Sequence, residues 1–205
     1  MFFKSNTQVF GSHNTMSYLP IKNWWLFPGL LIARCQNKDY KTQFEQGCRV
    51  FDLRIYWDKD INNWGFAHGL INFKVKDDVF SVIRWLAETA KAKKEIIYVR
   101  IILEKFKDNK NMEEDMEFKY FCYHVESYLE NNDYIKFIGG NSKVNWEKLY
   151  TFDDDIPDKY VHQYVSSMAN DVRWYERIFP FLYAKRCNKK NKTKQLPIIN
   201  LFDFV

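Results

Sequence analysis

Hydrophobic and polar residues alternate along this chain in two patterns, one typical of strands and one typical of helices. The strand pattern is clearest over 49–56, where Asp52 and Arg54 fall on one face and apolar residues occupy the other. The helical pattern is clearest over 77–93, where apolar residues recur every three or four positions after an acidic first turn. The same criteria predict strands over 8–11, 64–68, 95–103, 134–138, 159–166 and 197–205, and helices over 112–130 and 171–183.

Strands that alternate with helices indicate an α/β fold with a mainly parallel sheet. We expect a small, incomplete (β/α)8 barrel of the TIM type, formed by one catalytic domain over residues 1–205. TIM barrels typically need about 250 residues, so some helices should be short or missing, above all between 132 and 171. In such barrels the catalytic side chains stand at the C-terminal ends of the strands.

Composition and charge narrow the class of protein. Hydrophobic residues make up 46% of the chain, which indicates a globular protein, and the net charge of +5 suits an anionic membrane or substrate. The excess is too small to indicate nucleic-acid binding, and no nucleic-acid motif is present. The basic run over 185–194 is predicted as a solvated loop, with a second membrane contact as the alternative.

No apolar run reaches the roughly 20 residues of a membrane-spanning helix, and no signal peptide is visible. We therefore expect a monomer that is cytoplasmic, or released by a non-standard route, and that acts at membrane surfaces. The cysteines show no metal-ligand spacing, so they are interpreted as free buried thiols in a reducing compartment, with no metal or cofactor. They are Cys35, Cys48, Cys122 and Cys187.

Two short segments carry histidines in a setting that suggests catalysis. His13 follows the first predicted strand and His68 ends the third, while Asp52 and Arg54 lie between them in the chain. Two imidazoles, a guanidinium and carboxylates are sufficient to cleave a phosphodiester without a metal. One imidazole takes a proton from the nucleophile, the other protonates the leaving group, and the guanidinium neutralises the phosphoryl oxygens.

The order and spacing of these segments resemble the X domain of phosphatidylinositol-specific phospholipase C, most strongly over 8–105. The calcium-dependent branch of that family has an acidic metal ligand where Arg54 stands, so the chain resembles the bacterial, metal-independent branch. The matching motifs are Ser12-His13-Asn14-Thr15, then Q-x-x-x-G-x-R-x-x-D-x-R over Gln43 to Arg54, then Ala67-His68-Gly69, and a helix and buried strand from Leu86 through Leu103.

This resemblance implies a mechanism and assigns roles. The inositol 2-hydroxyl would attack its own phosphorus, with His13 as general base, His68 as general acid and Arg54 in place of calcium, to release diacylglycerol and a cyclic phosphate. The family places a carboxylate behind the base, and Asp203, the one acid in the apolar terminal strand, is the candidate. Asn14 departs from the aspartate of many metal-independent members; an amide can orient the nucleophile or the arginine but carries no charge.

Several residues keep two interpretations. Asp52 either contacts substrate or holds Arg54 in position, and Arg100 either binds the sugar or phosphate or belongs to a structural ion pair. A cation site centred on Asn14, Asp52 and Glu104 is also conceivable, although the guanidinium among these residues would repel the ion.

Aromatic residues suggest two further contacts. Trp174 and Tyr175 are candidates for stacking on a sugar ring, with a core position as the alternative. Trp24, Trp25 and Phe27, which follow the first catalytic loop, are candidates for membrane contact, with a core-packed connector as the alternative. For the whole chain, the rival functions are a catalytically silent module that binds lipid or inositol phosphate, a phosphodiesterase for another lipid head group, and a nucleic-acid-binding protein.

Overall fold

The protein is seen here in a computed structural model. It describes residues 9–22, 24–26, 33–104, 120–121, 123–125, 127, 132–138, 161–164, 170–192 and 199–205. Most of the helix predicted over 112–130, the region 139–160, Phe27 and the Trp24 side chain lie outside the described part.

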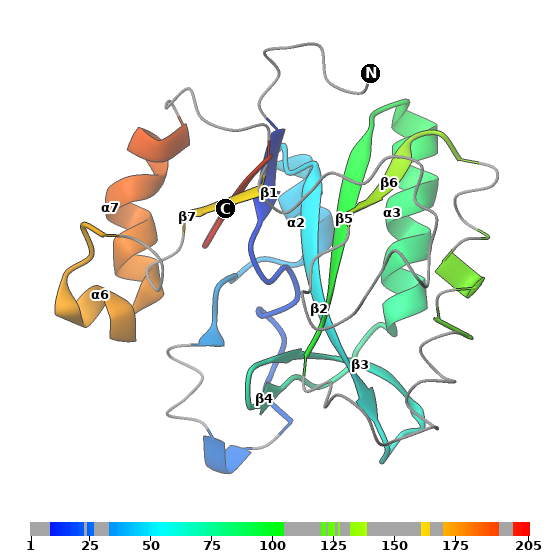
Figure 1. The fold of residues 1–205 in the computed structure, drawn as a ribbon, viewed down its shortest axis with the longest axis horizontal. Helices are drawn as coiled ribbons and strands as arrows, with labels where there is room; N and C mark the ends of the chain where they lie inside the picture. Colours follow the sequence, from blue (N-terminus) through cyan, green and yellow to red (C-terminus); the bar gives the residue numbers. More distant parts are fainter. Residues whose placement is uncertain are drawn as a thin grey trace.

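Parallel strands form the centre of the molecule, and β2 lies in the middle of them. The sheet curls into an open portion of a barrel (Figure 1), which confirms the predicted α/β class with an incomplete TIM-type barrel. Among the described residues the parallel strands run in the order β7, β8, β1, β2, β5, β6. They are β1 (Val9–Ser12), β2 (Val50–Asp58), β5 (Ile97–Leu103), β6 (Ile135–Ile138), β7 (Val161–Tyr164) and β8 (Ile199–Phe202).

An antiparallel hairpin extends this sheet. β3 (Asn63–His68) pairs with the second half of β2, and β4 (Ile71–Asn72) pairs with the end of β3. Because β1 pairs with β2 only as far as Phe51, the edge of β2 beyond that residue is open to β3. The hairpin therefore runs back toward the end of β1, and extending its register sets His68 level with Leu53 of β2.

Helix α3 (Val79–Lys93) confirms the helix predicted over 77–93 and packs beside β5 and β6 (Figure 1). The Asp78 side chain caps its first turn by accepting from the backbone N of Ser81 at 2.9 Å, and Lys94 ends it in a left-handed conformation. Its apolar face covers a core of fully buried side chains. Among them are Leu53, Ile55, Phe66, Val82, Ile83, Leu86 and Val99.

The C-terminal helix prediction is corrected by the structure. In place of one helix over 171–183 there are two, α6 (Trp174–Ile178) and α7 (Pro180–Lys192). The break falls at Phe179, because the ring of Pro180 disfavours helical backbone in the residue before it yet fits the first position of a new helix. The basic run is consequently helical as far as Lys192, where a loop was predicted.

Two further short elements are the 3-10 turn η1 (Trp24–Leu26) and the helix α2 (Tyr40–Glu45). Neither was predicted, because six residues or fewer are too short to show helical periodicity. The capping residue Asp39, which accepts from the backbone N of Thr42 at 2.8 Å, is the sequence feature that marks the start of α2. No helix of the described residues is both long enough and apolar enough to cross a membrane.

Candidate active site

The ends of three strands meet at one place in the sheet. His13 follows β1, His68 ends β3 and Asp203 follows β8. The register of β1 with β8 sets Ser12 beside Phe202, and the backbone N of His13 donates to the carbonyl of Phe202 at 2.9 Å. The residues that follow the two strands are therefore neighbours, as expected for parallel strands that end at the same edge of a sheet.

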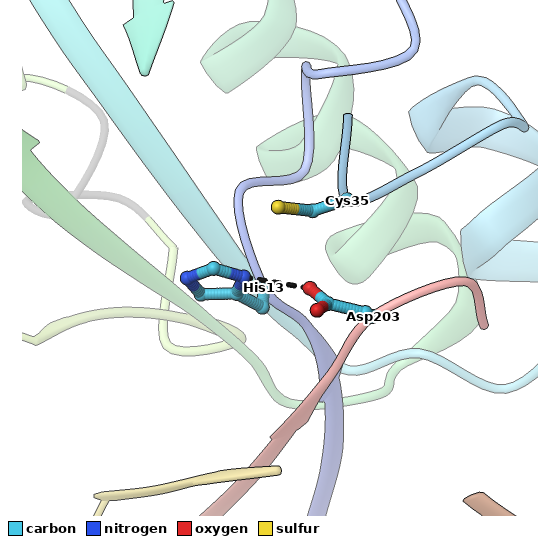
Figure 2. Close-up of side chains that lie close together, drawn as sticks. All are labelled: His13, Cys35 and Asp203. Carbon is cyan, nitrogen blue, oxygen red and sulfur yellow. Dashed lines mark hydrogen bonds and ion pairs between the residues drawn. The ribbon is translucent and has the colours of Figure 1, made fainter. Parts of the chain in front are cut away.

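His13 is held at both ring nitrogens. Its Nδ1 lies 2.7 Å from Oδ1 of Asp203, and its Nε2 lies 2.7 Å from Nη2 of Arg54 (Figure 2 shows the first contact). A carboxylate only accepts and a guanidinium only donates, so these partners select the neutral tautomer that carries its proton on Nδ1. Because His13 and Asp203 are 5% and 1% exposed, water does not compete with this pair.

Asp52 is the charged centre of the site, because its carboxylate binds the two arginines near His13. The carboxylate is fully buried; its Oδ2 accepts from Nε of Arg54 at 3.2 Å and from the backbone N of Asn14 at 2.9 Å, and its Oδ1 accepts from Nη1 of Arg100 at 3.1 Å. Burial raises the pKa of the Asp52 carboxyl, but the two guanidinium groups outweigh burial and hold that pKa well below its ordinary value. Asp52 is therefore ionised and fixes both arginines.

Arg54 connects the residues around it. Besides Asp52 and His13, it contacts Glu104, whose Oε1 accepts from Nη1 at 3.1 Å. Burial lowers the pKa of the guanidinium, yet Asp52 and Glu104 raise it above its ordinary value, so the group stays charged. The cation site conceived around Asn14, Asp52 and Glu104 thus holds a guanidinium between its two carboxylates.

His68 faces His13 from the other side of the site. The two rings meet edge to face with centroids 5.9 Å apart. Nδ1 of His68 lies 2.9 Å from the carbonyl of Ala33, which can only accept, so this nitrogen carries a proton and Nε2 is left to act. Burial lowers the pKa of His68 below its ordinary value, and the nearby charge of Arg54 lowers it further.

Asn14 adopts a conformation that is rare outside glycine, with φ of 43°. Its backbone N donates to Oδ2 of Asp52 at 2.9 Å, and its side chain is buried. Within the described part of the chain, the buried Nδ2 has no hydrogen-bond partner. Backbone strain is often stored at functional sites, and a buried donor without a partner calls for an explanation of its own.

Two residues of the site were missed by sequence reasoning. Gln36 donates from Nε2 to the carbonyls of His13 at 3.0 Å and Phe202 at 2.8 Å, and so fastens the ends of β1 and β8 together. Cys35 places its Sγ 3.8 Å from Nδ1 of His68, and burial, followed by the charge of Asp203, raises the pKa of its thiol well above the ordinary value. The segment around them has no periodicity, and no motif separates it from an ordinary loop.

The structure does not bring every candidate residue to this place. Arg100 is in the cluster, but Trp174 and Tyr175 lie on α6 at the edge of the molecule, apart from the strand ends (Figure 1). Trp174 is 77% exposed, and its ring packs against the ring of Tyr175 with 5.7 Å between the two centroids. Trp25, on η1, is 63% exposed.

Comparison with protein-family models finds no match, and comparison with curated proteins finds no relative of significant similarity. Solved structures do match. The phosphatidylinositol-specific phospholipase C from Listeria monocytogenes is 16% identical, with a TM-score of 0.64 over 97% of this chain and 88% of that chain. A single-site mutant of the Staphylococcus aureus enzyme is 15% identical, with a TM-score of 0.58 over 98% of this chain and 86% of that chain.

A second Staphylococcus aureus structure, described under the modulation of that enzyme's membrane binding, is 15% identical, with a TM-score of 0.55 over 98% of this chain and 86% of that chain. At such identities the likeness concerns the fold. The chain therefore shares the fold of bacterial phosphatidylinositol-specific phospholipases C over nearly its whole length.

Proposed function

We propose that this protein is a phosphodiesterase that cleaves phosphatidylinositol-type lipids to diacylglycerol and an inositol cyclic phosphate, without a metal. The observation that carries the proposal is the environment of His13, which has a carboxylate at Nδ1 and a guanidinium at Nε2. A carboxylate in that position fixes the tautomer of a base and stabilises the cation that the base becomes.

The guanidinium of Arg54 would bind the phosphodiester in this reaction. Before substrate binds, it donates to Nε2 of His13 and occupies the lone pair that a base needs. A phosphodiester anion is a stronger acceptor than an imidazole, so its oxygens would draw the guanidinium away and free Nε2 for the inositol 2-hydroxyl. Substrate binding would thus activate the base, while Asp52 and Glu104 keep the charge of Arg54 at the phosphorus.

Each proton in this reaction has a donor and an acceptor. Nε2 of His13 takes the proton of the 2-hydroxyl as its oxygen bonds to phosphorus. The bond from phosphorus to the glycerol oxygen breaks, and Nε2 of His68 supplies the proton that makes diacylglycerol neutral. His68 must therefore be protonated when substrate is bound, and the anionic phosphodiester offsets the burial and the Arg54 charge that lower its pKa. Exchange with water returns both rings to their starting states.

The choice of lipid is supported by the shared fold and by the motifs around His13, Arg54 and His68. We also propose that the protein docks on membranes through Trp25 and Leu70, which are 63% and 79% exposed. The two chain segments that carry these side chains lie side by side at Lys22 and Asn72, because the backbone N of Lys22 donates to the carbonyl of Asn72 at 2.7 Å. Exposed Trp and Leu side chains are suited to the lipid interface.

Activity is tested by measuring phosphatidylinositol cleavage in mixed micelles with excess chelator. We expect turnover in the wild type and losses of at least about 100-fold in His13→Ala, Arg54→Ala and Asp203→Asn. Arg177→Ala, which removes an exposed guanidinium from α6, is the matched control and should keep full activity. Circular dichroism of each variant separates loss of activity from loss of the fold.

The alternatives give different results. Turnover that requires calcium would refute the role of Arg54. Cleavage of a glycosylated or different phospholipid, but not of phosphatidylinositol, would move the proposal to another head group. Binding of the lipid by the folded protein with no turnover under any condition would indicate a silent module.

Docking is tested with vesicles of phosphatidylcholine and phosphatidylinositol. Trp25→Ala should reduce sedimentation with vesicles several-fold, whereas Tyr123→Ala, which removes another aromatic side chain that is 71% exposed, should not. Equal binding by both variants and the wild type would refute the assignment of Trp25.

A further inference from the structure

Cys35 lies beside the proposed catalytic residues, but its thiol has no part in the proposed reaction. It stands in the loop before α2, while His13 follows β1 and Asp203 follows β8. A ring nitrogen of His13, the Sγ of Cys35 and a carboxylate oxygen of Asp203 all lie within 4.8 Å of one another, and all three residues are buried. Of the two ring nitrogens, Nδ1 faces Asp203, with 2.7 Å between it and Oδ1. Figure 2 shows the sulfur standing over the hydrogen bond between the other two.

These three donors match one class of ligand. A thiolate, an imidazole nitrogen and a carboxylate oxygen are the usual ligands of zinc, and a thiolate excludes magnesium and calcium in favour of softer ions. We propose that the cluster of His13, Cys35 and Asp203 is a binding site for a thiophilic divalent cation such as Zn2+, and that the bound cation inhibits the enzyme. The inhibitory part of this proposal rests on the proposed function; the binding part does not.

The local charge favours a dication that displaces the proton of the thiol as it binds. With both histidines neutral, three carboxylates and two guanidinium groups leave the site with one negative charge, and a thiolate would add a second. A dication would neutralise the cluster. The charged groups counted are Asp52, Glu104, Asp203, Arg54 and Arg100.

The three donors are also held in place by other buried groups. Oγ of Ser17 accepts from the backbone N of Cys35 at 2.9 Å and from that of Gln36 at 2.9 Å, which fixes the loop that carries the sulfur. The Gln36 side chain in turn fastens the ends of the two strands that carry His13 and Asp203. Hydrogen bonds that orient ligands from behind in this way are a general feature of metal sites.

Binding would remove the general base. The cation bonds to Nδ1 of His13 and displaces its proton, which moves to Nε2, while the Cys35 thiol releases its own proton to water. An imidazole with a proton on Nε2 has no lone pair for the nucleophile, and that N–H meets the N–H of Arg54 in place of an acceptor. The cation and the active tautomer therefore exclude each other.

Binding is tested with Co2+ and Zn2+ on chelator-treated protein. Co2+ should give one equivalent of tetrahedral d–d absorption with a thiolate charge-transfer band. Cys35→Ser should lose that band and bind Co2+ at least about 100-fold more weakly, because losing a direct ligand should cost no less than the roughly 10–100-fold that losing an outer-shell partner costs. Cys187→Ser, which changes a buried cysteine of α7, should retain both. A thiolate band in Cys35→Ser, or its loss in Cys187→Ser, would overturn the assignment.

A measurement on the wild type removes any dependence on how the variants fold. Zinc-edge X-ray absorption should show one sulfur at about 2.3 Å and nitrogen or oxygen ligands at about 2.0–2.2 Å. A shell without sulfur would refute the site.

Inhibition is tested separately. One equivalent of Zn2+ should abolish lipid cleavage by the wild type, and excess chelator should restore it. In Cys35→Ser, compared with its own activity without metal, inhibition should need about 100-fold more Zn2+. If lipid cleavage is never observed but the cobalt and zinc spectra are as expected, the proposed function fails and the metal site stands. If cleavage is observed and Zn2+ binds without inhibiting it, the inhibitory role is wrong.

Discussion

Replacing Asp52 by asparagine should destabilise the protein strongly, because this side chain is fully buried and compensates two guanidinium groups. Removing one member of a buried ion pair costs about 3–5 kcal/mol, because the charge left behind stays buried. Arg54 retains Glu104, so the cost should lie near the lower end, about 3 kcal/mol. With a urea m value of about 3 kcal/mol/M for a chain of this size, the unfolding midpoint should fall by about 1 M.

The matched control is Asp60→Asn. Asp60 also forms a short ion pair, with Lys22 at 2.7 Å, but its side chain is 78% exposed. Exposed pairs contribute about 0–1 kcal/mol, so this variant should unfold close to the wild type. Urea unfolding followed by circular dichroism measures both. Midpoints of Asp52→Asn and Asp60→Asn that agree within error would refute the idea that Asp52 is the charged centre of the site.

The pH dependence follows from the direction of the pKa shift. The pKa of Asp52 lies well below its unfolded value in the folded protein, so the carboxylate contributes stability that is fully present above the unfolded pKa, and this stability is lost as pH falls through the folded pKa. The difference between wild type and Asp52→Asn should therefore be the same at pH 7 and at about pH 5. Below about pH 4 the difference should shrink, because the carboxyl is then protonated in the unfolded chain while it is still ionised in the folded protein. A difference that grows as the pH falls from 7 to 5 would show that the pKa is raised instead.

Three further variants test other parts of the structure. Gly11→Ala should lower stability by about 1–3 kcal/mol in urea unfolding, because the new Cβ would lie 2.6 Å from the carbonyl oxygen of Val50 and in contact with its Cβ; an unchanged midpoint would contradict the close approach of β1 and β2. NMR titration of His68 should give a midpoint below the ordinary 6.5, and Arg54→Gln should raise it; a midpoint that does not move would exclude the charge as a cause. Asn14→Gly should leave stability equal or higher, because it removes an unpaired buried amide and a strained φ. Lipid cleavage by this variant should fall at least about tenfold. Full activity would mean that the amide does not bind substrate.

The alternation of residues over 49–56 was enough to predict that Asp52 and Arg54 share a face, and their side chains do meet, with Nε and Oδ2 3.2 Å apart. The strands β1, β2, β3, β5 and β6 and the helix α3 were likewise predicted to within a few residues. These features depend on backbone periods of two and 3.6 residues, which a linear sequence displays directly. The contact between His13 and Asp203 is present, while their catalytic roles stay predictions.

The break at Phe179 shows where local patterns mislead. The apolar spacing of 171–183 continues across Pro180, and a single residue ends one helix and begins another. Similarly, the spacing of the cysteines gave no sign that Cys35 lies beside His13 and Asp203, because those two residues follow strands far away in the chain. Nothing in the sequence indicates which contacts Gln36 and Cys35 make.

The sequence by itself therefore determined most of the strands and helix α3, the face that Asp52 and Arg54 share, and the residue types available for chemistry. The tertiary structure alone decided which of them meet: Arg54 on the Nε2 of His13, Arg100 on Asp52, and Cys35 over the pair of His13 and Asp203. The physical reason is distance along the chain. His13 and Asp203 are 190 positions apart, and only the order and register of the parallel strands bring such residues within hydrogen-bonding distance.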